Sequence, residues 1–233
     1  MHQSANNLSN AHNRDIRRIV NTMDSIIKYG WYALLVVVVG EMLVPIILAP
    51  FYKGYSHTTM AISTLGNRNS PVRLPFNLWM LLAGILFFAA IPAIYNAYYQ
   101  VSKSLTLGSV LCIGIFAVGA CIFTCFFSVN ETKDVVTVAS KIHGAGSAVG
   151  FMLFLFVPLF LAILSFKAND KVDGIIAAIS FVLGLLFFVL FIMADKPEFQ
   201  RTIVAKEGLW QRMNLLFMYL PLGYIAVRNI FGR

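Results

Sequence analysis

The sequence predicts an all-α membrane protein that folds as a bundle of six transmembrane helices. Hydrophobic residues make up 59% of the chain and charged residues only 12%, whereas a soluble domain carries about 25% charged residues. Six apolar runs reach the roughly 20 residues that a helix needs to cross a bilayer. The composition and the length of these runs together favour a polytopic helical protein.

The six runs follow one another at short intervals. They are Trp31–Phe51, Phe76–Tyr99, Leu107–Ser128, Ile142–Phe166, Gly174–Ala194 and Leu209–Asn229. Because the loops between them are too short for a second domain, we expect one transmembrane domain over residues 31–233 and a tail over residues 1–30. Four prolines inside the runs remove backbone donors and are expected to kink their helices: Pro45, Pro92, Pro158 and Pro221.

The tail before the first run has an amphipathic pattern. Apolar residues recur there at helical spacing: Ile16, Ile19, Val20, Met23, Ile26 and Ile27. Basic residues occupy much of the other face, as in a helix that lies on an anionic membrane surface. The tail is therefore predicted to form an interfacial amphipathic helix.

Charge indicates the orientation and the partners. With the N-terminus inside, nine basic residues fall on each side of the membrane, so the overall count does not decide the orientation. The tail carries four of the inner nine, and the first helix usually dominates orientation. We expect a multi-pass protein of the cytoplasmic membrane with both termini in the cytoplasm. The net charge of +8 is spread without a dense basic run, which predicts contact with membrane lipids and no nucleic-acid partner.

Polar residues gather on the side that this orientation places outside. The two longer loops, residues 52–75 and 195–208, both lie there. Ser63 comes from the first of these loops, whose end is expected to form a short helix closed by Gly66. Three further side chains stand at the outer ends of runs two, four and six: Asn77, His143 and Arg212. Four separate regions of the chain thus contribute polar groups at one membrane depth.

Short motifs at these positions resemble a known family. They are Ser-x-Leu-Gly in the first outer loop, an Asn that opens run two, a His that opens run four and Gly-x-x-Gln-Arg that opens run six: Ser63, Leu65, Gly66, Asn77, His143, Gly208, Gln211 and Arg212. In order and placement they resemble the prokaryotic membrane family catalogued as domain of unknown function 998, from about Leu34 to the C-terminus. The resemblance implies six helices and a shared polar site, but no particular reaction.

Each polar residue has a structural and a functional interpretation. His143 either caps a tightly packed helix end, beside the Gly146/Gly150 helix-packing pair, or acts as a general base. Arg212 either extends its side chain to the interface or binds an anion such as phosphate, with Gln211 beside it. Ser63 is a helix-turn cap or a nucleophile. Asn77 is the N-cap of the second helix or an oxyanion donor.

Two functions remain open. The first is a membrane protein without chemistry that binds a lipid headgroup or a small anionic ligand through Arg212, Asn77 and Gln211. The alternative is an intramembrane hydrolase or transferase that acts on a lipid or lipid-linked substrate, with His143 as base and Ser63 or an activated water as nucleophile. A protein partner is not indicated by the sequence.

Other features that the sequence can indicate are cofactor sites, metal sites, reactive cysteines and buried acidic residues. No cofactor is expected, because only His143 is placed to ligate a haem. No metal site is expected either, because the available ligands are a poor zinc set: His57, His143, Glu131 and Asp134. Three cysteines in the third run lack redox or zinc spacing. Glu41 is the one acid deep inside a run, and its role is open between pairing across helices and proton movement.

Overall fold

The computed structural model describes residues 2–130 and 136–232, with side chains described from residue 16 onward. Within those residues the chain is helical and contains no strand. Its longer elements are α1 (His2–Leu48), α2 (Arg73–Tyr98), α3 (Lys103–Phe116), η3 (Ala117–Ile122), α4 (Phe123–Phe126), α5 (Val138–Phe154), α6 (Phe156–Lys167), α7 (Lys171–Met193) and α8 (Glu207–Phe231). Short 3-10 helices are η1 (Ala49–Phe51), η2 (Ile62–Gly66), η4 (Pro197–Phe199) and η5 (Ile203–Ala205).

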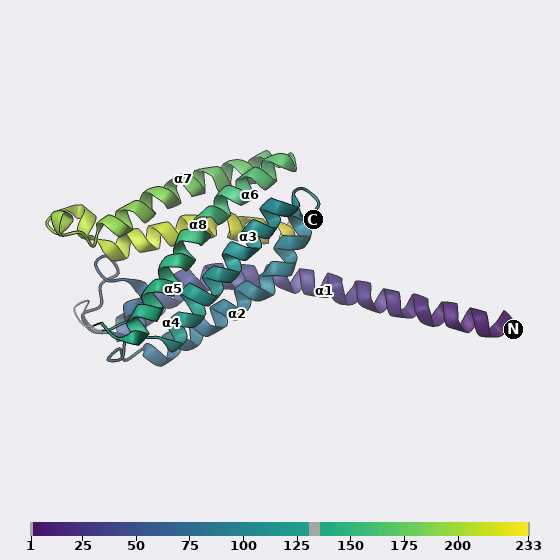
Figure 1. Ribbon diagram of the computed structural model, residues 1–233, viewed down its shortest axis with the longest axis horizontal. Helices are drawn as coiled ribbons and strands as arrows, with labels where there is room; N and C mark the ends of the chain where they lie inside the picture. Colours follow the sequence, from purple (N-terminus) through teal and green to yellow (C-terminus); the bar gives the residue numbers. More distant parts are fainter. Residues whose placement is uncertain (1, 131–135, 233) are drawn as a thin grey trace.

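Among the described residues, six helical segments are long and apolar enough to cross a membrane, which confirms the predicted fold class. The third consists of α3, η3 and α4, and the fourth of α5 and α6. α1 packs on α2 and α8, and α7 packs on α6 and α8. The loops over residues 52–72 and 194–206 lie at one end of the bundle, which we call the loop end (Figure 1). The C-terminus lies at the opposite end, where α1 leaves the bundle.

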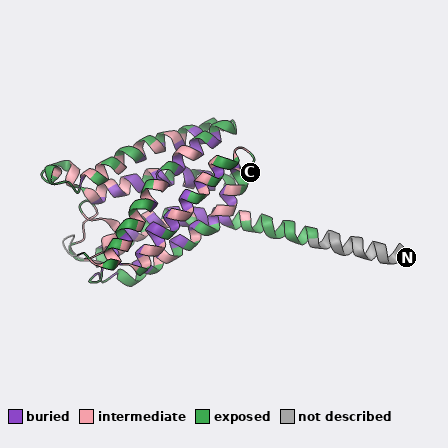
Figure 2. Cartoon of the chain, in the orientation of Figure 1, coloured by how far each residue is buried: buried purple, intermediate pink, exposed green. Residues whose placement is uncertain are grey.

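The tail and the first span form one continuous helix. α1 runs without a break across residue 30 and projects far beyond the bundle (Figures 1 and 2). Apolar side chains on the projecting part, such as Ile19, Val20 and Met23, are more than half exposed. Farther along, Gly30 lies against Ala93 of α2, so the same helix becomes part of the bundle there.

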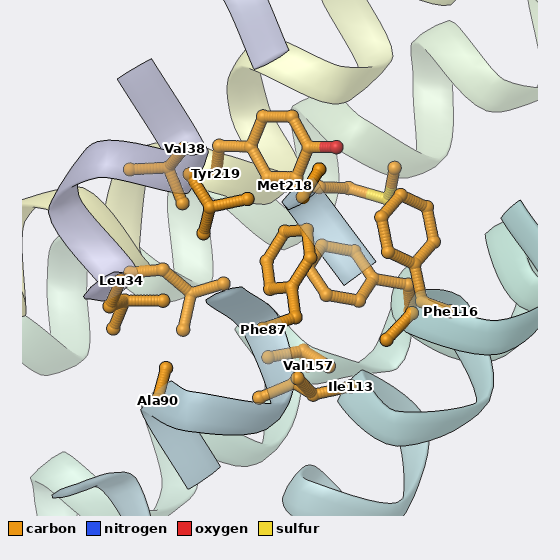
Figure 3. Packing of buried hydrophobic residues seen from close by; sticks show 14 of the residues in the cluster. Leu34, Val38, Phe87, Ala90, Ile113, Phe116, Val157, Met218 and Tyr219 are labelled. Atoms are coloured by element: carbon orange, nitrogen blue, oxygen red, sulfur yellow. The ribbon is translucent and has the colours of Figure 1, made fainter. Parts of the chain in front are cut away.

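Aromatic rings fill the centre of the bundle. Phe87 of α2 lies against Phe116, Phe154 and Tyr219, with ring centroids 5.5, 5.8 and 6.1 Å away. The Phe116 and Phe154 rings lie tilted against each other with centroids 4.3 Å apart, and Figure 3 shows Leu34, Val38 and Met218 around the same group. Lipid tails are as apolar as these side chains, so the bundle gains stability from this close packing rather than from hydrophobic burial.

Glycines bring two spans into backbone contact near the loop end. A Cβ on Gly119 of η3 would lie 2.3 Å from the Gly146 carbonyl oxygen, and one on Gly146 would lie 3.0 Å from the Gly119 oxygen. Gly150 packs against Ala120 in the same way. The predicted Gly146/Gly150 pair is therefore a helix-packing contact. Its partner segment, η3, is a π-helical turn, a feature that recurs at functional sites.

Two predicted helix caps are wrong. α2 begins at Arg73, so Asn77 lies in its second turn rather than at its N-cap. α5 begins at Val138, where Thr137 and Ser140 form a reciprocal capping box, so His143 is not a cap either. Both predictions took the start of the long apolar run for the start of the helix, whereas α2 and α5 begin three and four residues before these runs.

Prolines fall inside helices without ending them at three of the four predicted positions. Pro45, Pro92 and Pro221 lie within continuous helices. The fourth span is instead divided at Leu155, three residues before Pro158. Proline at 158 has no N–H to bond the Phe154 carbonyl, which accounts for the division.

Candidate functional site

A cavity of about 770 Å³ extends inward from the loop end of the bundle. This volume falls in the range of roughly 300–1,000 Å³ typical of small-molecule sites. Toward the centre of the bundle, its lining includes the apolar residues Met80, Phe116, Phe188 and Leu215 together with Glu41. Nearer the loop end, its lining includes the polar residues Ser63, Asn130, Ser140, His143, Ser147 and Gln211 beside apolar ones such as Ile62 and Phe76. Phe116 belongs to the aromatic centre of the bundle as well, so that packing closes the deep end.

His143 lies on the cavity wall and is almost fully buried. Its Nδ1 is 3.4 Å from Thr124 Oγ1. Thr124 donates to the Ala120 carbonyl at 2.6 Å. Because Ala120 belongs to the π-helical turn η3, the irregular part of the third span positions the group that faces the histidine. His143 is thus held by protein contacts at the edge of a ligand-sized space.

Ser63 and Gln211 line the same cavity as His143. The Gln211 Oε1 accepts a hydrogen bond from the Ile62 backbone N–H at 2.7 Å, which fixes the side chain against η2. Among the hydrogen bonds between described residues, none joins Ser63 to His143. Ser63, Gln211 and His143 thus place a hydroxyl, an amide and an imidazole along one cavity.

Arg212 holds the first loop in place and does not line the cavity. Its guanidinium donates to the carbonyls of His57, Met60 and Gly208 at 2.7, 3.2 and 2.7 Å. It also donates to the Tyr55 hydroxyl at 2.5 Å. The expected anion-binding residue is thus occupied by loop oxygens, and its place in the structure is that of a residue positioning the loop.

The first turn of α8 contacts the first loop, residues 52–72, at two further points. A Cβ on Gly208 would lie 2.3 Å from the Met60 carbonyl oxygen, so only glycine allows this approach. The Leu209 N–H donates to the Thr58 carbonyl at 3.0 Å. Burial, with the charge of Arg212 nearby, lowers the pKa of His57, so the imidazole stays neutral at pH 7 beside the guanidinium.

Asn77 secures the other end of this loop. Its amide donates to the Cys125 carbonyl of α4 at 3.1 Å. Gly66 lies directly over it, because a Cβ there would be 2.7 Å from Asn77 Oδ1. Leu65 is fully buried beside them. Asn77 is absent from the cavity lining, so the structure separates it from Ser63, Gln211 and His143.

Glu41 is a cavity residue whose partners the sequence did not indicate. Its Oε1 accepts from Trp79 Nε1 at 2.8 Å and its Oε2 accepts from the Tyr219 hydroxyl at 3.1 Å. Gly40 makes room for the indole, since a Cβ there would lie 2.1 Å from the ring. With a rise of 1.5 Å per residue, Glu41 lies about 10 Å below the end of α1. The carboxylate joins α1, α2 and α8 at the wall of the cavity.

Charge around the cavity is mixed. Among its described lining residues the cation is Lys141, and the acids are Glu41, Asp195 and Glu207. The described residues contain no group of three or more His, Cys, Asp or Glu side chains that could hold a metal ion. Glu131 and Asp134 lie outside the described residues.

The motif residues divide into two groups by contact. Six of them hold the first loop against the bundle: Leu65, Gly66, Asn77, Gly208, Gln211 and Arg212. Ser63 and His143 line the cavity, as Gln211 also does. The motif residues thus hold the first loop beside the cavity and place three side chains, those of Ser63, His143 and Gln211, in its lining.

Comparison with known proteins adds the family and no activity. No curated protein and no solved structure matches the chain. The family model described as "Protein of unknown function (DUF998)" matches residues 33–228. The match covers most of the chain, including every motif residue named above, and the protein belongs to this family.

Proposed function

We propose that the protein binds one membrane lipid in the cavity, with the lipid headgroup at the loop end. The observation that carries this proposal is the cavity lining, which is mostly apolar toward the centre of the bundle, apart from Glu41, and includes Ser63, His143 and Gln211 nearer the loop end. An amphiphile matches both parts at once, because its chain contacts Phe188 and Leu215 while its head meets Ser63, His143 and Gln211. Ligand sites of this kind combine a mostly apolar wall with a few fixed polar groups.

The lining favours a lipid headgroup over a small free anion. A small anion would need a dedicated cation, and the guanidinium of Arg212 is engaged by the loop. Lys141 is exposed at the edge of the cavity, and the lining also includes the acidic residues Asp195 and Glu207. A head that offers hydroxyl, amine or zwitterionic groups suits this mixture better.

Native mass spectrometry of the protein in mild detergent tests the proposal. The wild-type protein is expected to carry an adduct of lipid mass. Ser147→Trp fills the cavity and should remove the adduct, whereas Ala145→Trp lies on the exposed side of the same helix, outside the lining, and should keep it. A wild-type protein free of lipid, or an adduct that survives Ser147→Trp unchanged, would overturn the proposal.

A second function, lipid hydrolysis or transfer, is favoured by one observation. Ser63 and His143 line the same cavity, so a bound lipid would meet a hydroxyl and an imidazole together. Because no hydrogen bond joins them, the version with a water nucleophile activated by His143 is the stronger one. Comparison of cellular lipids in a deletion strain and in strains that carry the wild type or His143→Gln tests it. Loss of the wild-type profile in His143→Gln supports enzymatic action; a profile identical to wild type contradicts it.

We propose, in addition, that the protein lies in the cytoplasmic membrane with both termini in the cytoplasm. The support is the basic tail before the first span. This orientation places the polar part of the cavity in the outer leaflet. The bound lipid would therefore be one whose head faces the cell exterior.

A further inference from the structure

Two side chains line the cavity and also face outward from the bundle. Met152 of α5 is 54% exposed and Ile192 of α7 is 48% exposed, yet both belong to the cavity wall. Ala148, one turn before Met152, is likewise exposed and lines the cavity. All three lie within spans, so at their level the outward direction faces lipid. The cavity therefore has an opening toward the bilayer between α5 and α7.

The helix packing leaves room for this opening. α5 packs on α3 and η3, whereas α7 packs on α6 and α8. Neither α7 nor α8 is among the closely packed neighbours of α5. In Figure 1, α5 and α7 diverge toward the loop end, with α8 between them in the view. We call this opening the α5–α7 slot and define it by Ala148, Met152 and Ile192.

An aromatic pair joins α5 and α7 beside the slot. The rings of Phe151 on α5 and Phe191 on α7 lie with centroids 6.4 Å apart, and both side chains line the cavity. Phe151 also packs on Phe116 at 5.5 Å, which ties it to the core. Each side chain has rotatable bonds that allow it to turn aside without moving its helix.

We infer that a bilayer lipid enters the cavity sideways through the α5–α7 slot, and that Phe151 and Phe191 form the gate. This inference rests on the proposed lipid binding and adds the route and the class of ligand. A ligand that enters from the bilayer never leaves the membrane, so it is a lipid of the leaflet at the loop end rather than a solute from the water. The small and polar residues Gly144, Ser147 and Ala148 on the α5 side give the headgroup a path along the wall.

The competing route is the mouth at the loop end. Thr59 and Glu207 line the cavity there, and a water-soluble ligand would pass between them. The two routes use different residues, so they can be blocked separately. Each also has a neighbouring residue that is exposed but does not line the cavity: Val149 beside Ala148, and Thr58 beside Thr59.

Lipid exchange distinguishes the routes. Purified protein with its native lipid is reconstituted into vesicles of deuterated phosphatidylethanolamine and phosphatidylglycerol, and native mass spectrometry follows the replacement of the bound lipid. Ala148→Trp, with Met152→Trp as a second slot variant, is expected to slow exchange by about tenfold, as closing a gate does. Val149→Trp, Thr59→Trp and Thr58→Trp should exchange at the wild-type rate. Phe191→Ala should exchange faster than wild type.

The outcomes separate the route from the proposed function. If wild-type protein exchanges lipid and both slot variants match its rate, the lateral route is wrong although lipid binding stands. Slowed exchange in Thr59→Trp alone would assign entry to the loop-end mouth. If the wild-type protein carries no lipid at all, lipid binding and the lateral route fall together.

Discussion

Glu41 links three helices through a single carboxylate. Replacing it by leucine leaves the Trp79 N–H and the Tyr219 hydroxyl without acceptors in an apolar region, and each such loss costs about 1–3 kcal/mol. We expect Glu41→Leu to lower the free energy of unfolding by this order and to lower the thermal midpoint in detergent. Met42→Leu, a volume-conserving change at the next position, should leave the midpoint unchanged. A Glu41→Leu protein as stable as wild type would show that the two hydrogen bonds contribute nothing.

Arg212 contributes through the loop that it holds. Arg212→Ala removes four hydrogen bonds to residues 55–60 and to Gly208, so the first loop should open more often. We expect faster trypsin cleavage after Lys53 and Arg68, measured by mass spectrometry of the fragments. Arg201→Ala, a change at an exposed arginine of the other long loop, is the control. Equal cleavage of the two variants after Lys53 would contradict the positioning role.

At the scale of elements, contact between η3 and α5 determines the wall that carries His143. A methyl group on Gly119 would meet the Gly146 carbonyl oxygen at 2.3 Å. Gly119→Ala should therefore destabilise the protein by about 1–3 kcal/mol, as overpacking does. Gly144→Ala on the same wall meets no atom within 4 Å and should leave stability equal or slightly higher. Thermal unfolding of the two variants side by side measures the difference.

If both variants unfolded at the same temperature, the close contact between η3 and α5 would be wrong. Lipid binding provides a second measurement on the same pair. Displacement of α5 in Gly119→Ala moves His143 and Ser147 away from η2, so the variant should also lose part of its bound lipid. Gly144→Ala should retain it.

Sequence patterns predicted the elements well and their contacts poorly. Six apolar runs located all six spans, because hydrophobic length alone decides whether a helix can cross a bilayer. The helix starts were misplaced at Asn77 and His143, since the first turn of each helix mixes polar and apolar residues and so lies outside the apolar run. Of the polar groups expected to share one site at the loop end, Ser63, His143 and Gln211 line one cavity, whereas Asn77 and Arg212 do not.

Contacts between distant residues explain what the sequence could not indicate. Glu41 meets Trp79 and Tyr219, which are 38 and 178 residues away along the chain. Arg212 meets loop carbonyls about 150 residues away. Because every residue has a backbone carbonyl, the sequence does not indicate which of them accepts a hydrogen bond. The charge of Arg212 therefore pointed to an anion, whereas the fold provides backbone oxygens.

At the scale of the whole molecule, orientation decides which leaflet the cavity faces. In a variant whose three native cysteines are alanine, Glu198→Cys lies at the loop end and Ser104→Cys at the opposite end, and both positions are exposed. With cytoplasmic termini, an impermeant thiol reagent should label Glu198→Cys in intact cells and should label Ser104→Cys only after lysis. The reverse pattern would invert the topology and place the bound lipid in the inner leaflet.

The most direct test of the central claim is a cryo-electron microscopy map of the protein in lipid nanodiscs. Lipid binding predicts an elongated density in the cavity, with its polar end within hydrogen-bond distance of Gln211 and His143 and its tail beside Phe188 and Leu215. Ser147→Trp, imaged in the same way, should lack this density. A wild-type map in which side chains close the cavity, or in which only separate water-sized peaks occupy it, would contradict the account.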